Sequence, residues 1–182
     1  MKERKYALAE KLQSSDMKAL RKKLGLTQRD FARLVNVSAK TVAYWESGKT
    51  EISGPIVTLV KILNENMEIA AKLEVSEKIY PLRLWYYYKN EVCTMIDVDE
   101  RKRMVKVRNY TKNDMLKAFG RQTEITFEIY EEFLESRCFP RERDKLKLKL
   151  KELDIPFYDP LMIIERTEGR MAEDEFWIKI ER

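Results

Sequence analysis

The sequence predicts an all-α domain of five short helices followed by a small α+β domain with an antiparallel sheet. Apolar residues recur at helical spacing through residues 5–75, between capping residues and glycines that end helices. From Ile79 to Tyr110 this spacing gives way to aromatic and β-branched runs that are typical of strands. Helical spacing then returns and continues to Gly169, before a last short strand. We therefore expect two domains, at residues 1–75 and 80–182.

The helices of the first domain are predicted from start and stop signals. N-cap residues precede the first three helices and glycines end two of them. Proline after glycine suits the first turn of the fourth helix, and a fifth follows directly. The signals are Ser14–Asp16 and Gly25 for the first helix, Thr27 for the second, Ser38 and Gly48 for the third, Gly54-Pro55 for the fourth, and the stretch 67–73 for the fifth.

The second domain begins with three predicted strands, at residues 82–88, 92–98 and 104–110, with a polar turn at 97–102. Four helices follow, and residues 175–180 predict a last short strand. The helices are expected at 112–119 after Thr111, at 127–138 after Thr126, at 141–153 after Pro140, and from Asp159-Pro160 to Gly169.

The positive charge lies in the first domain. The net charge is +5, and residues 1–75 hold 14 Lys and Arg against 9 Asp and Glu, whereas the remaining residues hold 22 of each sign. A basic segment beside a neutral one favours a polyanion as the partner of the first domain. A content of 44% apolar and 37% charged residues predicts that both domains fold.

Residue types in the chain argue against an enzyme and against a metal site. Histidine is absent, and the two cysteines, Cys93 and Cys138, are too few for a zinc site and are expected in the core. Neither a glycine-rich phosphate loop nor an activated nucleophile is apparent, so no cofactor is expected. Apolar runs stay short of the ~20 residues of a membrane span, and no signal-peptide pattern opens the chain, which predicts a cytoplasmic protein.

Residues 24–49 carry the pattern that bears on function. Two predicted helices of about eight residues are joined by Val35–Val37, and the small Ala32 lies where the helices must approach, which is the geometry of a helix-turn-helix. Together with the closing Trp45-Glu46-Ser-Gly-Lys49, this pattern resembles the Cro/C1-type (Xre) family of helix-turn-helix regulators. The resemblance implies that residues 38–47 form the recognition helix, and that Arg21 and Glu46 form a buried ion pair.

The resemblance also implies a set of DNA-contacting residues. Gln28, Ser38, Ser47 and Lys49 match positions that contact the DNA backbone, and Thr41 lies between base and backbone. Ala39, Lys40, Ala43 and Tyr44 match positions that face base edges. The chemistry agrees, because lysine donates to guanine and alanine packs on thymine methyl groups. Phe31, Val42 and Trp45 are expected in the core.

The second domain offers a weaker signal, a cluster of Arg137, Arg141 and Arg143 around a proline-bounded helix start. Such a cluster can bind an anion or a partner's carboxylates, or else form surface ion pairs with neighbouring acidic residues. The order of these features is weakly similar to the small N-terminal subdomain of HipA-like proteins.

Two functions remain open from the sequence. In the first, the chain is a homodimeric repressor of a palindromic double-stranded operator, and residues 80–182 serve oligomerisation, sensing or partner binding. In the second, it is antitoxin-like: residues 80–182 bind a toxin or another protein while the helix-turn-helix regulates its own operon.

Overall fold

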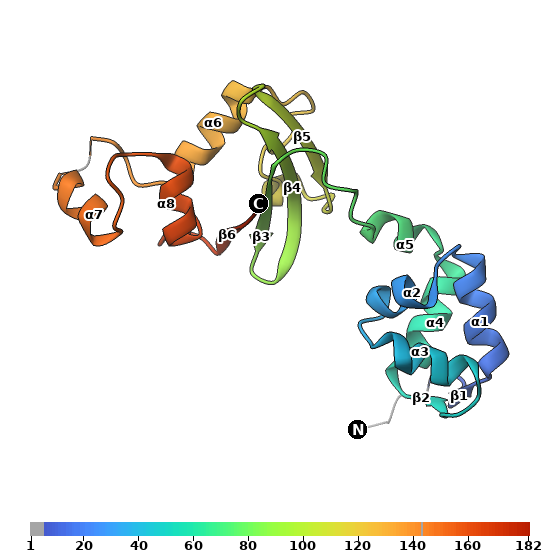
Figure 1. The fold of residues 1–182 in the computed structure, drawn as a ribbon. Coiled ribbons are helices and arrows are strands. Elements are labelled where there is room, and N and C mark those ends of the chain that lie inside the picture. Colours follow the sequence, from blue (N-terminus) through green and yellow to red (C-terminus); the bar gives the residue numbers. More distant parts are fainter. Residues whose placement is uncertain (1–5, 143) are drawn as a thin grey trace. The chain divides into compact units, whose positions relative to one another are not determined.

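The computed structural model describes residues 6–142 and 144–182, which divide into two compact units (Figure 1). The first unit ends at Val75 and the second begins at Ser76. Each unit has its own cluster of buried apolar side chains. The predicted fold class is observed: helices dominate the first unit, and the second combines helices with an antiparallel sheet. No helix within the described residues is both long enough and apolar enough to cross a membrane.

The described part of the first unit contains five α-helices and one pair of very short strands. The helices are α1 Ser14–Lys23, α2 Gln28–Leu34, α3 Ala39–Glu46, α4 Pro55–Glu65 and α5 Glu68–Leu73. The strands β1 Lys11–Leu12 and β2 Ile52–Ser53 pair antiparallel. The sequence did not predict this pair, because two residues leave no alternation to detect.

The hydroxyl groups of Thr27 and Ser38 cap α2 and α3 as predicted. Thr27 accepts a hydrogen bond from the N–H of Asp30 at 3.2 Å, and Ser38 accepts one from the N–H of Thr41 at 3.0 Å. These bonds satisfy N–H groups that have no acceptor in the first helical turn.

The start of α1 differs from the prediction. Gln13 is its N-cap and makes no side-chain capping bond, while Ser14 already lies inside the helix. The end agrees with the prediction, since Gly25 has φ of +70°, the left-handed conformation that ends helices.

The first four helices share one core. Met17, Phe31 and Val42 are fully buried, and Trp45 is 9% exposed. They come from α1, α2 and α3, and α4 adds Val60 and neighbouring apolar residues. Phe31, Val42 and Trp45 are thus in the core as predicted, and the burial of Val42 and Trp45 leaves the opposite side of α3 to face outward.

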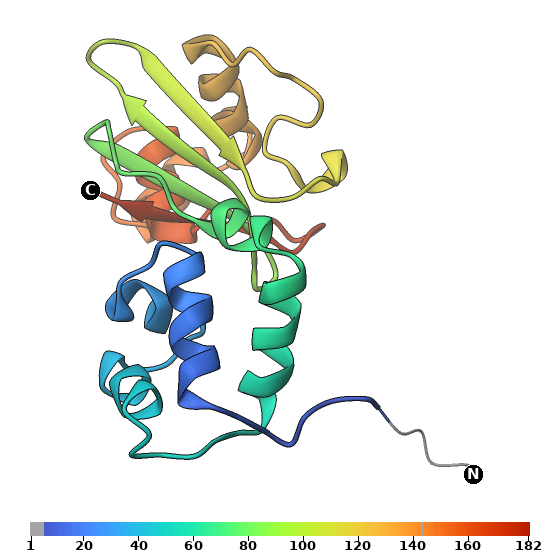
Figure 2. The same cartoon turned by 90° about the vertical axis from the view of Figure 1, so that its right-hand side faces the viewer.

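The second unit is built on a four-stranded antiparallel sheet in the order β5-β4-β3-β6 (Figure 2). β6, the last strand in the sequence, therefore pairs with β3, the strand of this sheet that comes first in the sequence. The strands are β3 Leu82–Tyr88, β4 Glu91–Asp99, β5 Met104–Asn109 and β6 Phe176–Glu181. Register pairs Leu84 with Ile96 on one side and with Ile180 on the other, so these three side chains point to the same face.

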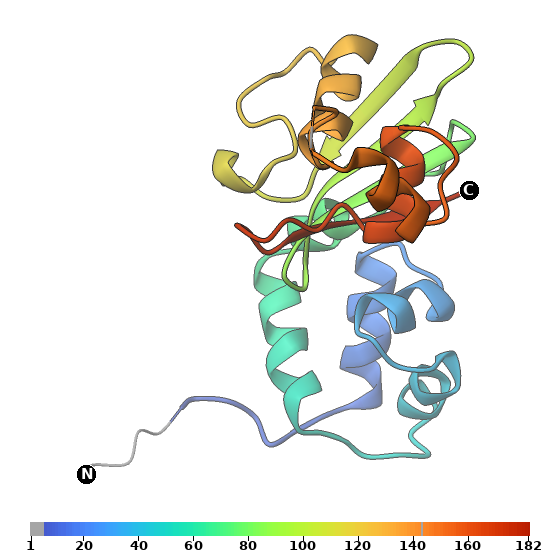
Figure 3. The same cartoon turned by 90° about the vertical axis from the view of Figure 1, so that its left-hand side faces the viewer.

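Helices cover that face of the sheet (Figure 3). α6 Phe127–Ser136 and α8 Pro160–Thr167 lie against the sheet, whereas α7 Leu146–Glu152 lies beyond α8 (Figure 1). The 3₁₀ turn η1 Asp114–Leu116 lies between β5 and α6 in the sequence. Phe133 of α6 and Ile163 of α8 join Leu84, Ile96 and Ile178 in one core. Both cysteines are free and buried in this core.

Two predicted helices are shorter than expected. At 112–119 only η1 forms, because the N–H of Ala118 donates to Thr94 Oγ1 of β4, 3.1 Å away, rather than to a carbonyl of its own segment. At 141–153 the helix begins at Leu146, because Lys145 adopts φ of +63°, which interrupts a right-handed helix.

Candidate nucleic-acid interface

The link between α2 and α3 has the geometry of a helix-turn-helix. Asn36 takes the left-handed conformation with φ of 55°, which asparagine tolerates better than most residues. The N–H of Val37 then donates to Ala32 O at 2.9 Å, which folds the link back on α2. Ala32 itself is 2% exposed. This turn sets the direction in which α3 leaves α2.

A three-residue network fixes α3 against the other two helices. Arg21 of α1 donates from Nε and Nη2 to the two carboxylate oxygens of Glu46 in α3, at 2.6 and 3.0 Å. Gln28 Nε2 of α2 donates to Glu46 Oε2 at 2.9 Å. The side chains of Arg21 and Glu46 are only 14% and 5% exposed. The carboxylate of Glu46 therefore binds all three helices together.

Electrostatics keep this network ionised. The hydrogen bonds from Arg21 lower the pKa of Glu46, and the bond from Gln28 adds to the effect while burial opposes it. The same pair raises the pKa of Arg21. Because the carboxylate stays charged near neutral pH, α3 is held by charge-assisted bonds under ordinary conditions.

The side of α3 that leaves the core presents the residues predicted to face bases. Ala39 and Lys40 are exposed, Ala43 is half-buried and Tyr44 is 39% exposed. Thr41, predicted between base and backbone, is half-buried. The structure thus brings these five side chains to the outer part of one helix.

Two lysines lie close to the ring of Tyr44. Lys40 Nζ and Lys49 Nζ each lie 5.5 Å from the centre of its ring. Lys40 and Tyr44 are one helical turn apart, whereas Lys49 reaches the ring after the chain turns at Gly48. The resulting surface joins an aromatic face to two positive charges, a combination that suits contact with DNA.

The predicted backbone-contacting residues flank this surface. Ser38, at the start of α3, forms a hydroxyl–hydroxyl hydrogen bond with Thr41 at 2.8 Å. Ser47 Oγ donates to Tyr44 O at 3.1 Å, which ties the end of α3 to the following turn. Ser38, Ser47 and Lys49 are all exposed, and Gln28 is half-buried because its amide is bound to Glu46.

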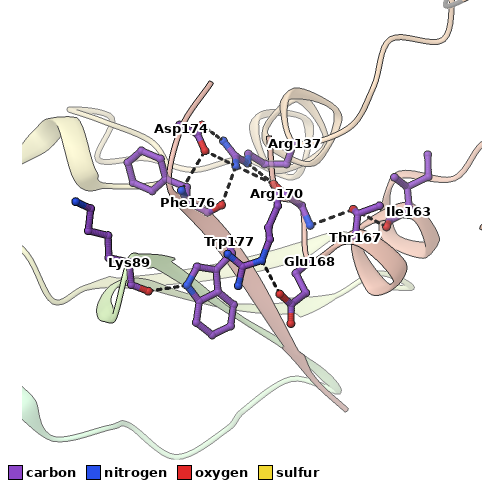
Figure 4. Close-up of polar contacts among 10 residues, drawn as sticks. Lys89, Arg137, Ile163, Thr167, Glu168, Arg170, Asp174, Phe176 and Trp177 are labelled. Atoms are coloured by element: carbon purple, nitrogen blue, oxygen red, sulfur yellow. Dashed lines mark hydrogen bonds and ion pairs between the residues drawn. The ribbon is translucent and has the colours of Figure 1, made fainter. Parts of the chain in front are cut away.

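The predicted arginine cluster of the second unit separates into different environments. Arg137 is 6% exposed, and its guanidinium donates to the carboxylate of Asp174, at 2.6 and 3.0 Å, and to the carbonyls of Gly169 and Phe176 (Figure 4). These internal bonds occupy the guanidinium, so Arg137 joins the end of α6 to the segment between α8 and β6.

The predictions for Arg141 and Arg143 differ in outcome, because the structure describes only the first of these two residues. Arg141 is exposed and pairs with Glu135, as the ion-pair alternative expects. Its role toward a partner stays a prediction. Arg143 lies outside the described residues.

Sequence reasoning missed one feature of the interface, the contact between Lys49 and Tyr44. The spacing of Lys40 and Tyr44 by four residues predicts that they meet on a helix. Lys49 follows a glycine with φ of +71°, and local spacing does not say where the chain goes after such a turn.

Comparison with known families agrees with the geometry of this segment. A family model described as helix-turn-helix matches residues 17–63, from within α1 to within α4. No curated protein matches the chain significantly. The family match indicates a DNA-binding transcription regulator.

Proposed function

We propose that the chain is a sequence-specific repressor that binds a palindromic double-stranded operator as a homodimer and is not an enzyme. Residues 38–47 act as the recognition helix in the major groove. The observation that carries this proposal is the outer surface of α3, where Lys40 and Lys49 lie close to the ring of Tyr44 while Val42 and Trp45 on the other side of the helix are buried.

The proposal gives the outer residues separate tasks. Lys40 donates to guanine O6 or N7, and Ala39 and Ala43 pack on thymine methyl groups. Tyr44 adds a ring and a hydroxyl to the same groove. Because two of these four side chains carry no hydrogen-bonding group, the shape of the DNA contributes to specificity as well.

The backbone contacts come from the flanks of α3. Lys49 and Ser47 approach phosphates after the helix, and Ser38 approaches one at its N-terminus, where the helix dipole favours an anion. Gln28 has two tasks, because its amide braces Glu46 and its position suits a phosphate contact. Loss of Gln28 is expected to weaken affinity with little change in sequence preference.

Dimerisation follows from the way such helices read DNA. One helix of this length contacts only a few base pairs, and two half-sites about 34 Å apart are bound by a two-fold dimer. The proposal assigns oligomerisation or sensing to the second unit, which has a core of its own.

The test is binding of the intact protein to a duplex from its own upstream region, titrated against salt with an unrelated duplex as control. A fragment ending at Val75 is measured in parallel. The proposal expects tight, specific binding by the intact chain and weaker binding by the fragment. Equal affinity of the intact protein for both duplexes would refute sequence-specific repression at this site.

A matched pair of lysine variants sharpens this test. Lys40→Ala should lose discrimination between the two duplexes, whereas Lys72→Ala removes an exposed lysine of α5 in the same unit. Lys72→Ala is expected to leave discrimination unchanged. A repression assay with the upstream region fused to a reporter then separates repression from activation.

A second candidate function is antitoxin-like, with a toxin or another protein bound by the second unit. One observation favours it: the half-buried rings of Tyr87 and Trp177 stack at 4.1 Å on the face of the sheet opposite the helices. Aromatic residues of this kind are enriched in protein interfaces. Co-expression with the product of the adjacent gene tests it, because Trp177→Ala should abolish a complex while DNA binding is retained.

A further inference from the structure

The second unit contains a cleft of about 410 Å³ between α6, the turn after β4 and the start of α8. Its volume lies in the range of small-molecule binding sites. Its lining combines six acidic side chains with several apolar ones. The acidic residues are Glu100, Glu128, Glu131, Glu132, Glu135 and Asp159; Arg141 is the cation among the lining residues, and Phe127, Leu134, Pro160 and Leu161 supply apolar surface.

The four glutamates of α6 form one stripe along the helix. Glu128 and Glu132 are four residues apart, as are Glu131 and Glu135, and like charges at this spacing destabilise a helix. Arg103 offsets part of this repulsion through Glu128 and Glu131, at 2.8 and 3.3 Å. The arrangement nevertheless concentrates negative charge on one side of the cleft.

Two carboxylates from elsewhere in the chain complete the wall. Glu100 follows β4 and Asp159 precedes α8. Burial, together with the negative charge of Asp159, raises the pKa of Glu100. A cation bound between these two side chains would relieve this repulsion.

A buried hydroxyl group provides an independent sign of a ligand. Tyr130 of α6 is 1% exposed, and its hydroxyl has no hydrogen-bond partner within residues 6–142 and 144–182. Burial raises its pKa first, and the charges of Glu100, Asp159 and Glu131 raise it further. Tyr130 itself is among the residues that line the cleft, together with these three carboxylates. A buried unpaired hydroxyl costs free energy that a donor from a ligand would recover.

The chemistry of the cleft favours an organic cation over a metal ion. No group of three Cys, Asp or Glu side chains in the described part of the chain lies close enough to hold a metal. The lining carboxylates come from three separate segments and alternate with apolar side chains. A ligand with a cationic group on an aliphatic chain matches the acidic and the apolar lining residues together. Its aliphatic chain would pack on Phe127 and Leu161 while its cationic group pairs with the carboxylates.

We infer that this cleft binds an alkylammonium or guanidinium group, with Glu100 and Asp159 pairing with its charge and the Tyr130 hydroxyl accepting a hydrogen bond from its N–H. The group belongs either to a free polyamine or to a lysine or arginine side chain. This inference goes beyond the proposed DNA-binding function and does not rest on it.

The test is calorimetric titration of the intact protein, without DNA and at low salt, with spermidine in one arm and N-acetylarginine amide in the other. We expect saturable binding of at least one probe at one site per chain. Binding of spermidine alone assigns the cleft to free polyamines, and binding of the arginine derivative alone assigns it to a protein side chain. Absence of saturable binding in both arms overturns the inference.

Three variants locate the site. Glu100→Gln should weaken binding about fivefold and Tyr130→Phe about tenfold, since each removes one contact to the cation. Glu124→Gln removes an exposed carboxylate of the same unit that does not line the cleft, and should leave affinity unchanged. Equal weakening by Glu124→Gln and Glu100→Gln would mean non-specific attraction and would overturn the inference.

Tyr130→Phe also separates binding from folding. Because the hydroxyl has no hydrogen-bond partner among the residues that the structure describes, its removal should leave the melting temperature unchanged or raise it. A variant that melts normally and binds as tightly as the native protein would show that the hydroxyl contacts no ligand.

Discussion

Replacing Glu46 by glutamine should destabilise the first unit. The carboxylate accepts two hydrogen bonds from Arg21, at 2.6 and 3.0 Å, and one from Gln28 at 2.9 Å. Glutamine keeps one acceptor oxygen and turns an NH₂ group toward the remaining donors. The variant therefore leaves a guanidinium that is 14% exposed without its counter-charge. We expect a loss of about 2–4 kcal/mol in the free energy of unfolding.

The assay is urea unfolding of a fragment ending at Val75, followed by tryptophan fluorescence. Trp45 is the one tryptophan in that fragment and lies next to Glu46 in α3. Glu51→Gln is the matched control, because Glu51 pairs with Lys11 but is 57% exposed. The control should cost less than about 1 kcal/mol. A loss for Glu46→Gln no larger than that of the control would refute the role of the network.

The same variant gives a pH test with a defined sign. Arg21 lowers the pKa of Glu46 in the folded state, below an unfolded value of about 4.3. The stabilisation is therefore present above that value and is lost as the pH falls through the folded pKa. The difference in stability between native and variant fragments should be full at pH 7 and should shrink below about pH 4. A difference that stays constant down to pH 2 would contradict this reasoning.

Three further predictions concern DNA recognition and the second unit. Lys40→Ala should weaken specific binding by about 1–3 kcal/mol in fluorescence anisotropy, whereas Gln28→Ala should lower affinity for specific and unrelated duplexes alike; an equal loss of preference in both would contradict the division of roles. Gly169→Ala should cost about 1–2 kcal/mol in thermal unfolding, because φ of +60° is strained for alanine and its Cβ would lie 3.3 Å from Ile178; an unchanged melting temperature would oppose this. Burial raises the pKa of Cys138 to about 12, so its thiol should resist alkylation at pH 8 until the protein is unfolded, and rapid labelling of the native protein, located by mass spectrometry, would be the contrary result.

Local signals predicted much of the fold because their physics acts within a few residues. Thr27 and Ser38 cap helices through bonds to N–H groups three positions later. The strand at 82–88 has the predicted bounds, since its aromatic residues favour the strand conformation. The inward residues of the helix-turn-helix were predicted for the same reason, from spacing along two short helices.

Predictions failed where a distant partner competed with a local signal. The helix expected at 112–119 gave way to a hydrogen bond with Thr94, 24 positions away. Arg137 bonds to Asp174, 37 positions away, instead of to its acidic sequence neighbours. In both places the local sequence offers a satisfactory partner, and the tertiary fold offers a better one.

The sequence by itself determined the helix-turn-helix and the residues that its second helix buries, because helical periodicity assigns residues to faces. Only the tertiary structure decided that Lys49 meets Tyr44, that Gln28 is bound to Glu46, and that Glu100 and Asp159 join the glutamates of α6 around one cleft. These contacts depend on how separate elements pack, and packing is fixed by the burial of whole faces rather than by any short stretch of residues.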